Sequence, residues 1–373
     1  MNQSLILRGG TVVTGSGLQT ADIAIKNGKI QCVLPDYRLL SKQKVDSNNL
    51  PEIIDISSFF VLPGFISLHP GNRIAQSADK MNGQIQSFLA RGITSFVDIL
   101  PLHIWEGKDR LAYLLNPFQS SEMDYAVRIQ LPVEKFTYAH VRILRSLGHR
   151  WIDVMVHSKE QLNEIEWDKL YPLLAQHHIF LSLVIPGDGN LSQSEREQIK
   201  YEWYELCRYG NIRSLVQGKR KHRLNDDYYL IQQLSPTEIP EHLSAIRENN
   251  WLALEPIVAS FEDWVEPIAT KGWTGEDLLA VLVRLASANV AKTVGLFPYK
   301  GCLAPGADAD LVLLEKSEWL TNFDRSTMLK ISEICLPTYV MTKGQWQYVF
   351  GKQVLQSTNG EYLQQLKPYN YTI

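Results

Sequence analysis

The segment WIDVMVHSKEQ, residues 151–161, joins a short β-prone run to the start of a helix. Ser158 can accept a hydrogen bond from a free backbone N–H of the first helical turn, and Gln161 can reach back to the backbone of Ser158. Ser192 and Glu195 repeat this pairing after another apolar run. Such junctions predict strands followed directly by helices, and hence parallel strands joined by helical crossovers.

On both sides of this segment, β-prone runs alternate with helical patterns, which is typical of an α/β fold. Seven runs qualify as strands: 59–68, 93–100, 125–133, 151–157, 179–186, 228–234 and 251–258. An eighth is not evident, because only residues 259–273 separate the seventh run from a helix that begins near Thr274. We therefore predict a TIM-type (β/α) barrel that is incomplete near strand 8, either distorted there or with a short eighth strand.

The two ends of the chain are rich in short strands and lack this alternation. Near the start, Asn27-Gly28 separates two apolar runs, which is a strong hairpin signal because both residues accept positive φ. Strand-like runs at 309–314, 338–341 and 346–350 follow the last helical pattern. We predict a small β-sandwich domain built from residues 1–59 and 296–373, and a barrel domain of residues 60–295.

The composition is that of an ordinary globular protein. The 373 residues include 37 basic and 40 acidic side chains, for a formal net charge of −3. This near-neutral balance gives no net positive charge that would attract nucleic acid. The apolar runs are far shorter than the ~20 residues of a transmembrane helix. The four cysteines are scattered, and the chain starts without a signal-peptide pattern. We expect a cytoplasmic protein that binds neither nucleic acid nor membrane.

The chain also lacks the short motifs of several enzyme classes: the Gly-x-Ser-x-Gly elbow, the Gly-rich phosphate loop, the dinucleotide-binding fingerprint and His-Glu-x-x-His. In a barrel, functional side chains lie at the C-terminal ends of the strands. The candidates at these ends are His69, Arg73, Asp98, Asp153, His157, Asp188, Gln232, Gln233 and Glu255. Each also has a structural explanation, since strand-end aspartates often cap helices and histidines often pack in cores.

Several segments resemble the amidohydrolase superfamily. Residues 61–69, VLPGFISLH, are similar to its first barrel strand, and residues 91–98, RGITSFVD, to its second. Residues 286–292, ASANVAK, and 300–312, KGCLAPGADADLV, resemble its C-terminal return into a β-sandwich. The dihydroorotase and dihydropyrimidinase branch of cyclic amide hydrolases is the best match. The resemblance implies a metal-dependent hydrolase with a barrel and a small sandwich.

This resemblance also implies a site. One or two divalent ions, held by imidazoles and carboxylates, would ionise a water that attacks an amide carbonyl. The family's first strand ends in His-x-His, with a substrate-binding arginine two residues on, and this chain has HPGNR at 69–73. The resemblance thus makes His69 a metal ligand and Arg73 a substrate-binding residue, while Gly71 offers no second ligand. The fourth-strand ligand falls on Asp153.

The remaining ligand positions are lost in this alignment. The run at 180–186 has no histidine where the fifth strand should supply one, and Gln233 stands where a sixth-strand histidine is expected. Only His69 and Asp153 survive, whereas catalytic zinc normally takes three protein ligands and a water. We therefore expect a dihydroorotase-like pseudoenzyme with no catalytic residue and no cofactor. The resemblance implies a structural role beside an active subunit in pyrimidine metabolism, such as aspartate transcarbamoylase, or in a homo-oligomer.

Two alternatives stay open. The first is an active metal-dependent hydrolase of cyclic amide carbon–nitrogen bonds with a rebuilt mononuclear zinc site. That site would draw on His69, Asp153, His157 and either Asp188 or Glu255. The second is a small-molecule binding module in which Arg73 clamps an anionic ligand.

Overall fold

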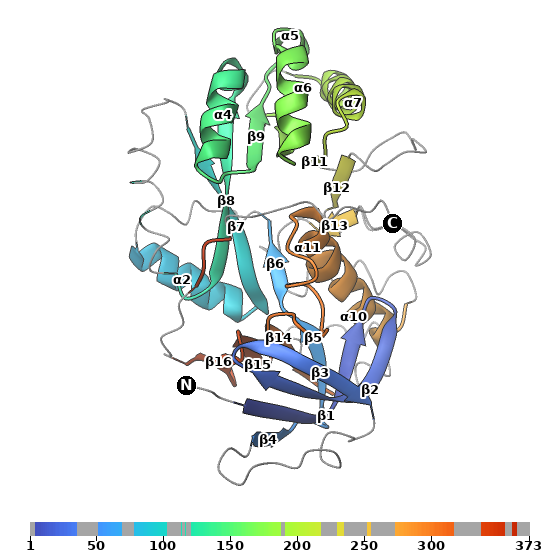
Figure 1. Ribbon diagram of the computed structural model, residues 1–373. Coiled ribbons are helices and arrows are strands. Elements are labelled where there is room, and N and C mark those ends of the chain that lie inside the picture. The colour runs from blue at the N-terminus through green and yellow to red at the C-terminus, as the bar shows by residue number, and fades with distance from the viewer. Residues whose placement is uncertain are drawn as a thin grey trace.

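The fold is known from a computed structural model (Figure 1). It describes residues 4–35, 51–68, 78–102, 113, 116, 121–187, 191–217, 230–234, 252–254, 273–316, 337–354 and 360–363. Two sheets organise these residues, one of eight strands from the middle of the chain and one of nine strands from both ends. Figure 1 shows the nine-stranded sheet at the bottom of the molecule and the helices of the middle segment above it.

The eight-stranded sheet is parallel throughout and follows chain order. Its strands are β6 (Phe65–Ser67), β7 (Ile93–Pro101), β8 (Asp124–Pro132), β9 (Trp151–Met155), β10 (Phe180–Val184), β11 (Ser214–Gln217), β12 (Leu230–Leu234) and β13 (Leu252–Leu254). Among the described residues, β13 and β6 do not pair, so the sheet curls without closing. The predicted TIM-type (β/α) barrel, incomplete near strand 8, is confirmed.

The strand that the sequence analysis missed is the sixth, not the eighth. β11 pairs with β10 on one side and β12 on the other, at a point where no strand was predicted. The runs at 228–234 and 251–258 therefore provide strands seven and eight, and the expectation that strand 8 falls in 259–273 was wrong. β13 has three residues and falls on the run that was predicted as the seventh strand. β11 was not predicted because it has only four residues, and only two of them are strongly apolar.

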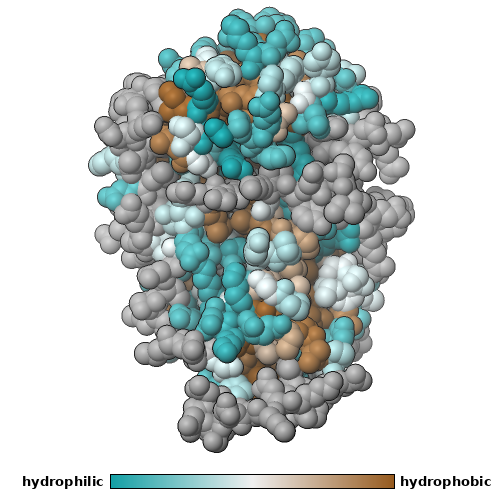
Figure 2. Space-filling model, viewed as in Figure 1, coloured by the Kyte–Doolittle hydropathy of each residue, from teal (hydrophilic) through white to brown (hydrophobic). Residues whose placement is uncertain are grey.

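Helices connect and cover these strands. They are α2 (Ala78–Leu89), α4 (Tyr138–Ser146), α5 (Glu160–Asn163), α6 (Trp167–Gln176), α7 (Gln193–Tyr209), α10 (Gly275–Val283) and α11 (Asn289–Thr293), with the short turns η3 (Val133–Lys135) and η6 (Arg284–Ala288). α2 packs on β7 and α7 on β11. The upper, helix-covered end is mainly hydrophilic on the face seen in Figure 2. No described helix is long and apolar enough to cross a membrane.

One of the two predicted helix starts is confirmed. The Ser192 side chain accepts from the Glu195 N–H, and the Glu195 carboxylate accepts from the Ser192 N–H at 2.7 Å, which completes the expected capping box of α7. At the start of α5 the expectation was wrong. Gln161 Oε1 accepts from the His157 N–H at 2.7 Å and not from Ser158, because the helix begins only at Glu160.

The nine-stranded sheet joins the two ends of the chain. Its strands are β1 (Ser4–Thr14), β2 (Gly17–Lys26), β3 (Lys29–Pro35), β4 (Glu52–Asp55), β5 (Phe59–Pro63), β14 (Leu311–Glu315), β15 (Tyr339–Thr342), β16 (Gln345–Val349) and β17 (Lys352–Gln353). β14 lies antiparallel to β5, and β5 lies parallel to β1. The predicted hairpin connects β2 and β3, with φ of 52° at Asn27 and 74° at Gly28.

The run at 59–68 was predicted as one barrel strand and forms two strands in different sheets. β5 pairs with β1 and β14, whereas β6 pairs with β7. Gly64 lies between them, where a Cβ would stand 2.0 Å from Thr94 Oγ1. Its N–H donates to the Asp310 carbonyl at 2.8 Å, and its carbonyl accepts from Ser287 Oγ at 2.6 Å. The chain therefore passes from one sheet to the other at a position that only glycine fits.

Two apolar clusters lie on opposite faces of the barrel strands. The inner cluster combines one or two residues from each of six strands with residues in and after α11: Ile66, Leu68, Val97, Ala126, Trp151, Phe180, Leu215, Val290, Ala291, Val294 and Leu296. The outer cluster takes alternate residues of the same strands, such as Ile152 and Val154, together with helix residues such as Leu170 and Trp203. This alternation identifies the face of each strand that lines the barrel interior.

Candidate functional site

Only some of the predicted site residues fall within the described part of the chain. His69, Arg73, Asp188 and Glu255 lie outside it, and nothing is described of the side chains of Gln232 and Gln233. His69 as a metal ligand and Arg73 as a substrate-binding residue therefore stay predictions. The described candidates are Asp98, Asp153 and His157, and they occupy three different environments.

Asp153 lies in the barrel interior. Its neighbours Ile152 and Val154 pack in the outer cluster and Trp151 in the inner one, so alternation along β9 turns the aspartate inward. The residue is 0% exposed. The structure thus places the predicted fourth-strand ligand inside the barrel, where the family resemblance implies it.

The charged partner of Asp153 is Arg128 of β8. Arg128 Nε lies 3.2 Å from Asp153 Oδ2, and the two side chains are 5% and 0% exposed. Gln130 is the β8 residue in register with Asp153, so Arg128, two residues earlier on the same face, reaches the carboxylate diagonally. An inward arginine on the neighbouring strand therefore pairs with the predicted metal position.

Two further side chains complete this arrangement. The Arg128 guanidinium lies 5.2 Å from the centre of the Trp151 ring, within the range of a cation–π contact. Trp151 Nε1 donates a hydrogen bond to Ser182 Oγ of β10. Arg128, Trp151, Asp153 and Ser182, here called the inner polar cluster, thus link three consecutive strands across the barrel interior.

Burial dominates the electrostatics of this cluster. It raises the pKa of Asp153 above its ordinary value, while the Arg128 charge and the Ser182 hydroxyl act in the opposite direction. A guanidinium stays protonated at all ordinary pH values, so it remains a cation beside the aspartate. The net shift of the Asp153 pKa is upward, and the cation nearest to the carboxylate is a side chain of the same chain.

The zinc that the resemblance implies does not fit the described part of this site. A zinc ion bonds carboxylate oxygen at about 2.0–2.2 Å, which would place a dication close to a guanidinium that is already 3.2 Å from the same carboxylate. Like charges at that spacing repel strongly in a buried setting. Moreover, β10 and β11, with sequences FLSLV and SLVQ, contain no histidine.

The other two described candidates lie apart from Asp153. Asp98 is 1% exposed, and its carboxylate accepts from the Ile99 N–H at 2.8 Å. It shares its face of β7 with Phe96, which belongs to the outer cluster, and so points away from the interior. The His157 side chain is exposed and follows Asp153 by four residues, or about 13 Å of extended chain. The structure brings neither residue to the inner polar cluster.

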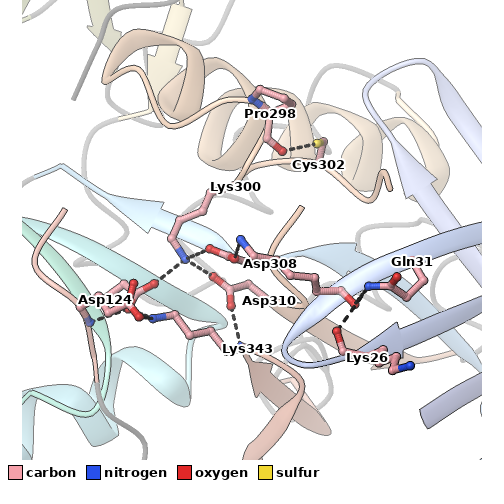
Figure 3. Close-up of polar contacts among 11 residues, drawn as sticks. Lys26, Gln31, Asp124, Pro298, Lys300, Cys302, Asp308, Asp310 and Lys343 are labelled. Atoms are coloured by element: carbon pink, nitrogen blue, oxygen red, sulfur yellow. Dashed lines mark hydrogen bonds and ion pairs between the residues drawn. The ribbon is translucent and has the colours of Figure 1, made fainter. Parts of the chain in front are cut away.

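A second buried charge cluster, which the sequence analysis missed, includes Asp124, the first residue of β8 (Figure 3). Lys300 Nζ lies 2.8 Å from Asp124 Oδ2, 3.0 Å from Asp308 Oδ2 and 2.6 Å from Asp310 Oδ2. Lys343 Nζ lies 2.7 Å from Asp124 Oδ1. We call these five residues the lysine cage. It connects the start of β8 to the segment before β14 and to the turn after β15.

The Lys300 ammonium occupies the position among the three carboxylates that a metal ion would take. Asp124, Asp308 and Asp310 are the group of described acidic, histidine or cysteine residues close enough to share one ion, but the Lys300 ammonium already contacts all three. Burial lowers the pKa of Lys300, but the three carboxylates raise it by more, so it stays protonated. The segment KGCLAPGADAD contains Lys300, Asp308 and Asp310, but their partner Asp124 is remote in the sequence.

Comparisons with known proteins agree with this architecture. No protein-family model matches the sequence. An adenine deaminase from Desulforamulus reducens is 24% identical over 328 residues, which are 82% of this chain and 52% of that protein. The chain thus spans about half the length of this curated relative.

Solved structures match over nearly the whole chain. A D-hydantoinase aligns with a TM-score of 0.67 at 16% identity, over 99% of this chain and 100% of the other. A dihydropyrimidinase from Brevibacillus agri aligns with a TM-score of 0.64 at 15% identity, over 99% and 100%. A zinc-bound adenosine deaminase from Xanthomonas campestris aligns with a TM-score of 0.63 at 14% identity, over 95% of each chain. At these identities the likeness concerns the fold alone, and the chain has the fold of the hydantoinase and dihydropyrimidinase structures.

Proposed function

We propose that this chain is a catalytically inactive, dihydroorotase-like homologue with a structural or partner-binding role in pyrimidine metabolism. One observation carries the proposal. β10 and β11 are the fifth and sixth barrel strands, and neither contains a histidine. The resemblance implies a metal-binding histidine on each of these strands. Without them a catalytic zinc lacks the three protein ligands that it normally takes.

The chemistry of this fold class depends on that ion. A bound divalent cation lowers the pKa of water, so that hydroxide forms near neutral pH, and it polarises the scissile carbonyl. Within the described residues, the only inherited ligand is Asp153, and its nearest charged neighbour is a cation. A barrel without its Lewis acid can still serve as a scaffold, because the fold alone does not define an activity.

Metal content and turnover test the proposal together. The full chain would be purified without chelator, with and without zinc or manganese supplementation, and its metal measured by plasma mass spectrometry. Turnover would be assayed on dihydroorotate, dihydrouracil, hydantoin, adenine and adenosine. We expect substoichiometric metal and no turnover. His178→Asn is a matched control for His69→Ala, because His178 is exposed and has φ of 50°, which asparagine tolerates.

The opposite result would establish the active hydrolase. Stoichiometric zinc together with turnover, both lost in His69→Ala and kept in His178→Asn, would contradict the pseudoenzyme proposal. It would also direct attention to Glu255, which follows the last residue of β13 directly in the sequence.

The partner proposal has its own test. Sedimentation velocity of the full chain, alone and mixed with aspartate transcarbamoylase catalytic chains from the same source, separates the two assemblies proposed here. A complex with the catalytic chains, or a homo-oligomer, supports the structural role. A chain that stays monomeric in both samples contradicts it.

A further inference from the structure

The buried pair of Arg128 and Asp153 has a consequence beyond the loss of ligands. A carboxylate enclosed in a barrel needs a counter-charge, since an isolated buried ion is very unfavourable. In a metal-dependent barrel that counter-charge is the ion itself. Here the cation nearest to Asp153 is a side chain on the adjacent strand, with Nε 3.2 Å from Oδ2.

We propose that Arg128 is a resident cation that takes the electrostatic place of the metal ion at the fourth-strand carboxylate. This inference rests on the proposed function and names the residue that lets the barrel persist without metal. Unlike a metal ion, the guanidinium is covalently attached, so neither dilution nor a chelator removes it. It is also permanently charged.

The surroundings of Arg128 support this role. It is 4% exposed on the inward face of β8, where an unpaired arginine would be strongly disfavoured. The Trp151 ring lies 5.2 Å from the guanidinium, and the hydrogen bond from Trp151 Nε1 to Ser182 Oγ orients the indole. Trp151 and Ser182 are thus positioning residues for the cation. They occupy strands on which the family resemblance would otherwise place metal ligands.

The test is a double-mutant cycle on the full chain with Arg128→Met, Asp153→Asn and both together. Arg128→Met leaves the Asp153 carboxylate without a counter-ion and should lower the melting temperature by about 5–10 °C at neutral pH. Asp153→Asn in the same chain removes the uncompensated charge and should recover much of that loss. Lys169→Met is the matched control, because the ion pair of Lys169 with Glu166 is exposed at 64% and 57%.

The double-mutant cycle also distinguishes a missing counter-ion from a mere packing defect. A packing defect at position 128 would persist when Asp153 is replaced, so Asp153→Asn would recover none of the loss in Arg128→Met. That result would overturn the proposal.

Zinc provides the second readout. We expect excess zinc or a chelator to leave the melting temperature and metal content of the wild-type chain unchanged. Zinc bound by the wild-type chain and lost in Asp153→Asn would overturn the inference, since the carboxylate would then hold a metal despite Arg128. The two proposals fail separately. Zinc binding at Asp153 without turnover contradicts only this inference, and metal-free turnover contradicts only the proposed function.

Discussion

Single side chains contribute strongly to stability where the two sheets meet. Lys300 is 3% exposed and contacts three carboxylates, which would repel one another in its absence. Burial raises the pKa of Asp310, and the Lys300 ammonium acts in the opposite direction. Lys29 forms a further ion pair with Asp308 at the edge of the cage. The stability of this region therefore depends on a charge balance.

Lys300→Met tests that balance. Removing the cation leaves buried carboxylates uncompensated, which should reduce the free energy of unfolding by about 3–5 kcal/mol. Urea unfolding would measure the change. Lys200→Met, at a pair whose partners are both 21% exposed, should cost about 1 kcal/mol or less. A similar loss in both variants would contradict the assigned role of Lys300.

Gly64 is the second residue with a defined steric role. A Cβ at this position would stand 2.0 Å from Thr94 Oγ1 and 2.5 Å from Thr94 Cγ2. Gly64→Ala should therefore destabilise the fold by about 1–3 kcal/mol, the usual cost of overpacking. Gly83→Ala is the control, because nothing lies within 4 Å of a Cβ there and alanine favours the interior of α2. Equal melting temperatures for the Gly64 variant and wild type would refute the close approach.

At the scale of elements, a C-terminal segment, residues 361–363, lies parallel to the start of β8. The Tyr125 N–H donates to the Glu361 carbonyl at 3.1 Å, and the Leu363 N–H donates to the Tyr125 carbonyl at 2.8 Å. Tyr362 stacks on Tyr125 at 5.3 Å, and its hydroxyl lies 2.7 Å from His149 Nδ1. This short segment therefore adds backbone and aromatic contacts to the N-terminal end of the barrel.

His149 makes that docking sensitive to acid. Burial lowers the pKa of His149 from 6.5 to about 4. The unfolded chain thus binds more protons in this interval, and the stabilisation is complete above pH 6.5 and is lost as the pH falls toward 4. We expect His149 to account for a loss of about 2 kcal/mol between pH 7 and pH 5.

Urea unfolding of the wild type and of His149→Gln at both pH values isolates this contribution, since the other histidines are common to both chains. The variant should show a smaller decline in stability. Identical declines would mean that His149 titrates normally in the folded chain.

At the scale of the whole molecule, the lysine cage connects the two sheets. Asp124 begins β8 in the eight-stranded sheet, while Asp310 precedes β14 and Lys343 follows β15 in the nine-stranded sheet. Gly64 and its hydrogen bonds provide a second connection nearby. The outer cluster also includes residues of the nine-stranded sheet, such as Val312 and Val340, so the two sheets share a core and should unfold as one cooperative unit.

Calorimetry would test this coupling. We expect one transition for the wild-type chain and one transition at a lower temperature for Lys300→Met, because the outer cluster still joins the two sheets in the variant. Two separated transitions in the variant would show that the cage, and not the shared core, couples the sheets.

Much of the architecture could be predicted from local patterns. Alternation of β-prone and helical runs indicated the barrel, Asn27-Gly28 indicated the hairpin, and the Ser192–Glu195 pairing indicated the start of α7. These signals are local, because turn conformation, capping and amphipathic period depend on neighbours in the chain. The choice of Asp153 came from the family resemblance, and its inward position is known from the packing of its neighbours in β9.

Other features depend on contacts between remote residues. β11 is too short and too weakly apolar to be recognised before it pairs with β10 and β12, and the run at 59–68 divides between two sheets because Thr94 leaves room only for glycine. Composition revealed neither the partner of Asp153 nor that of Lys300. Ion pairs in a buried site form between side chains that come together only in the folded chain. The local periodicity of the sequence does not show which strands become neighbours.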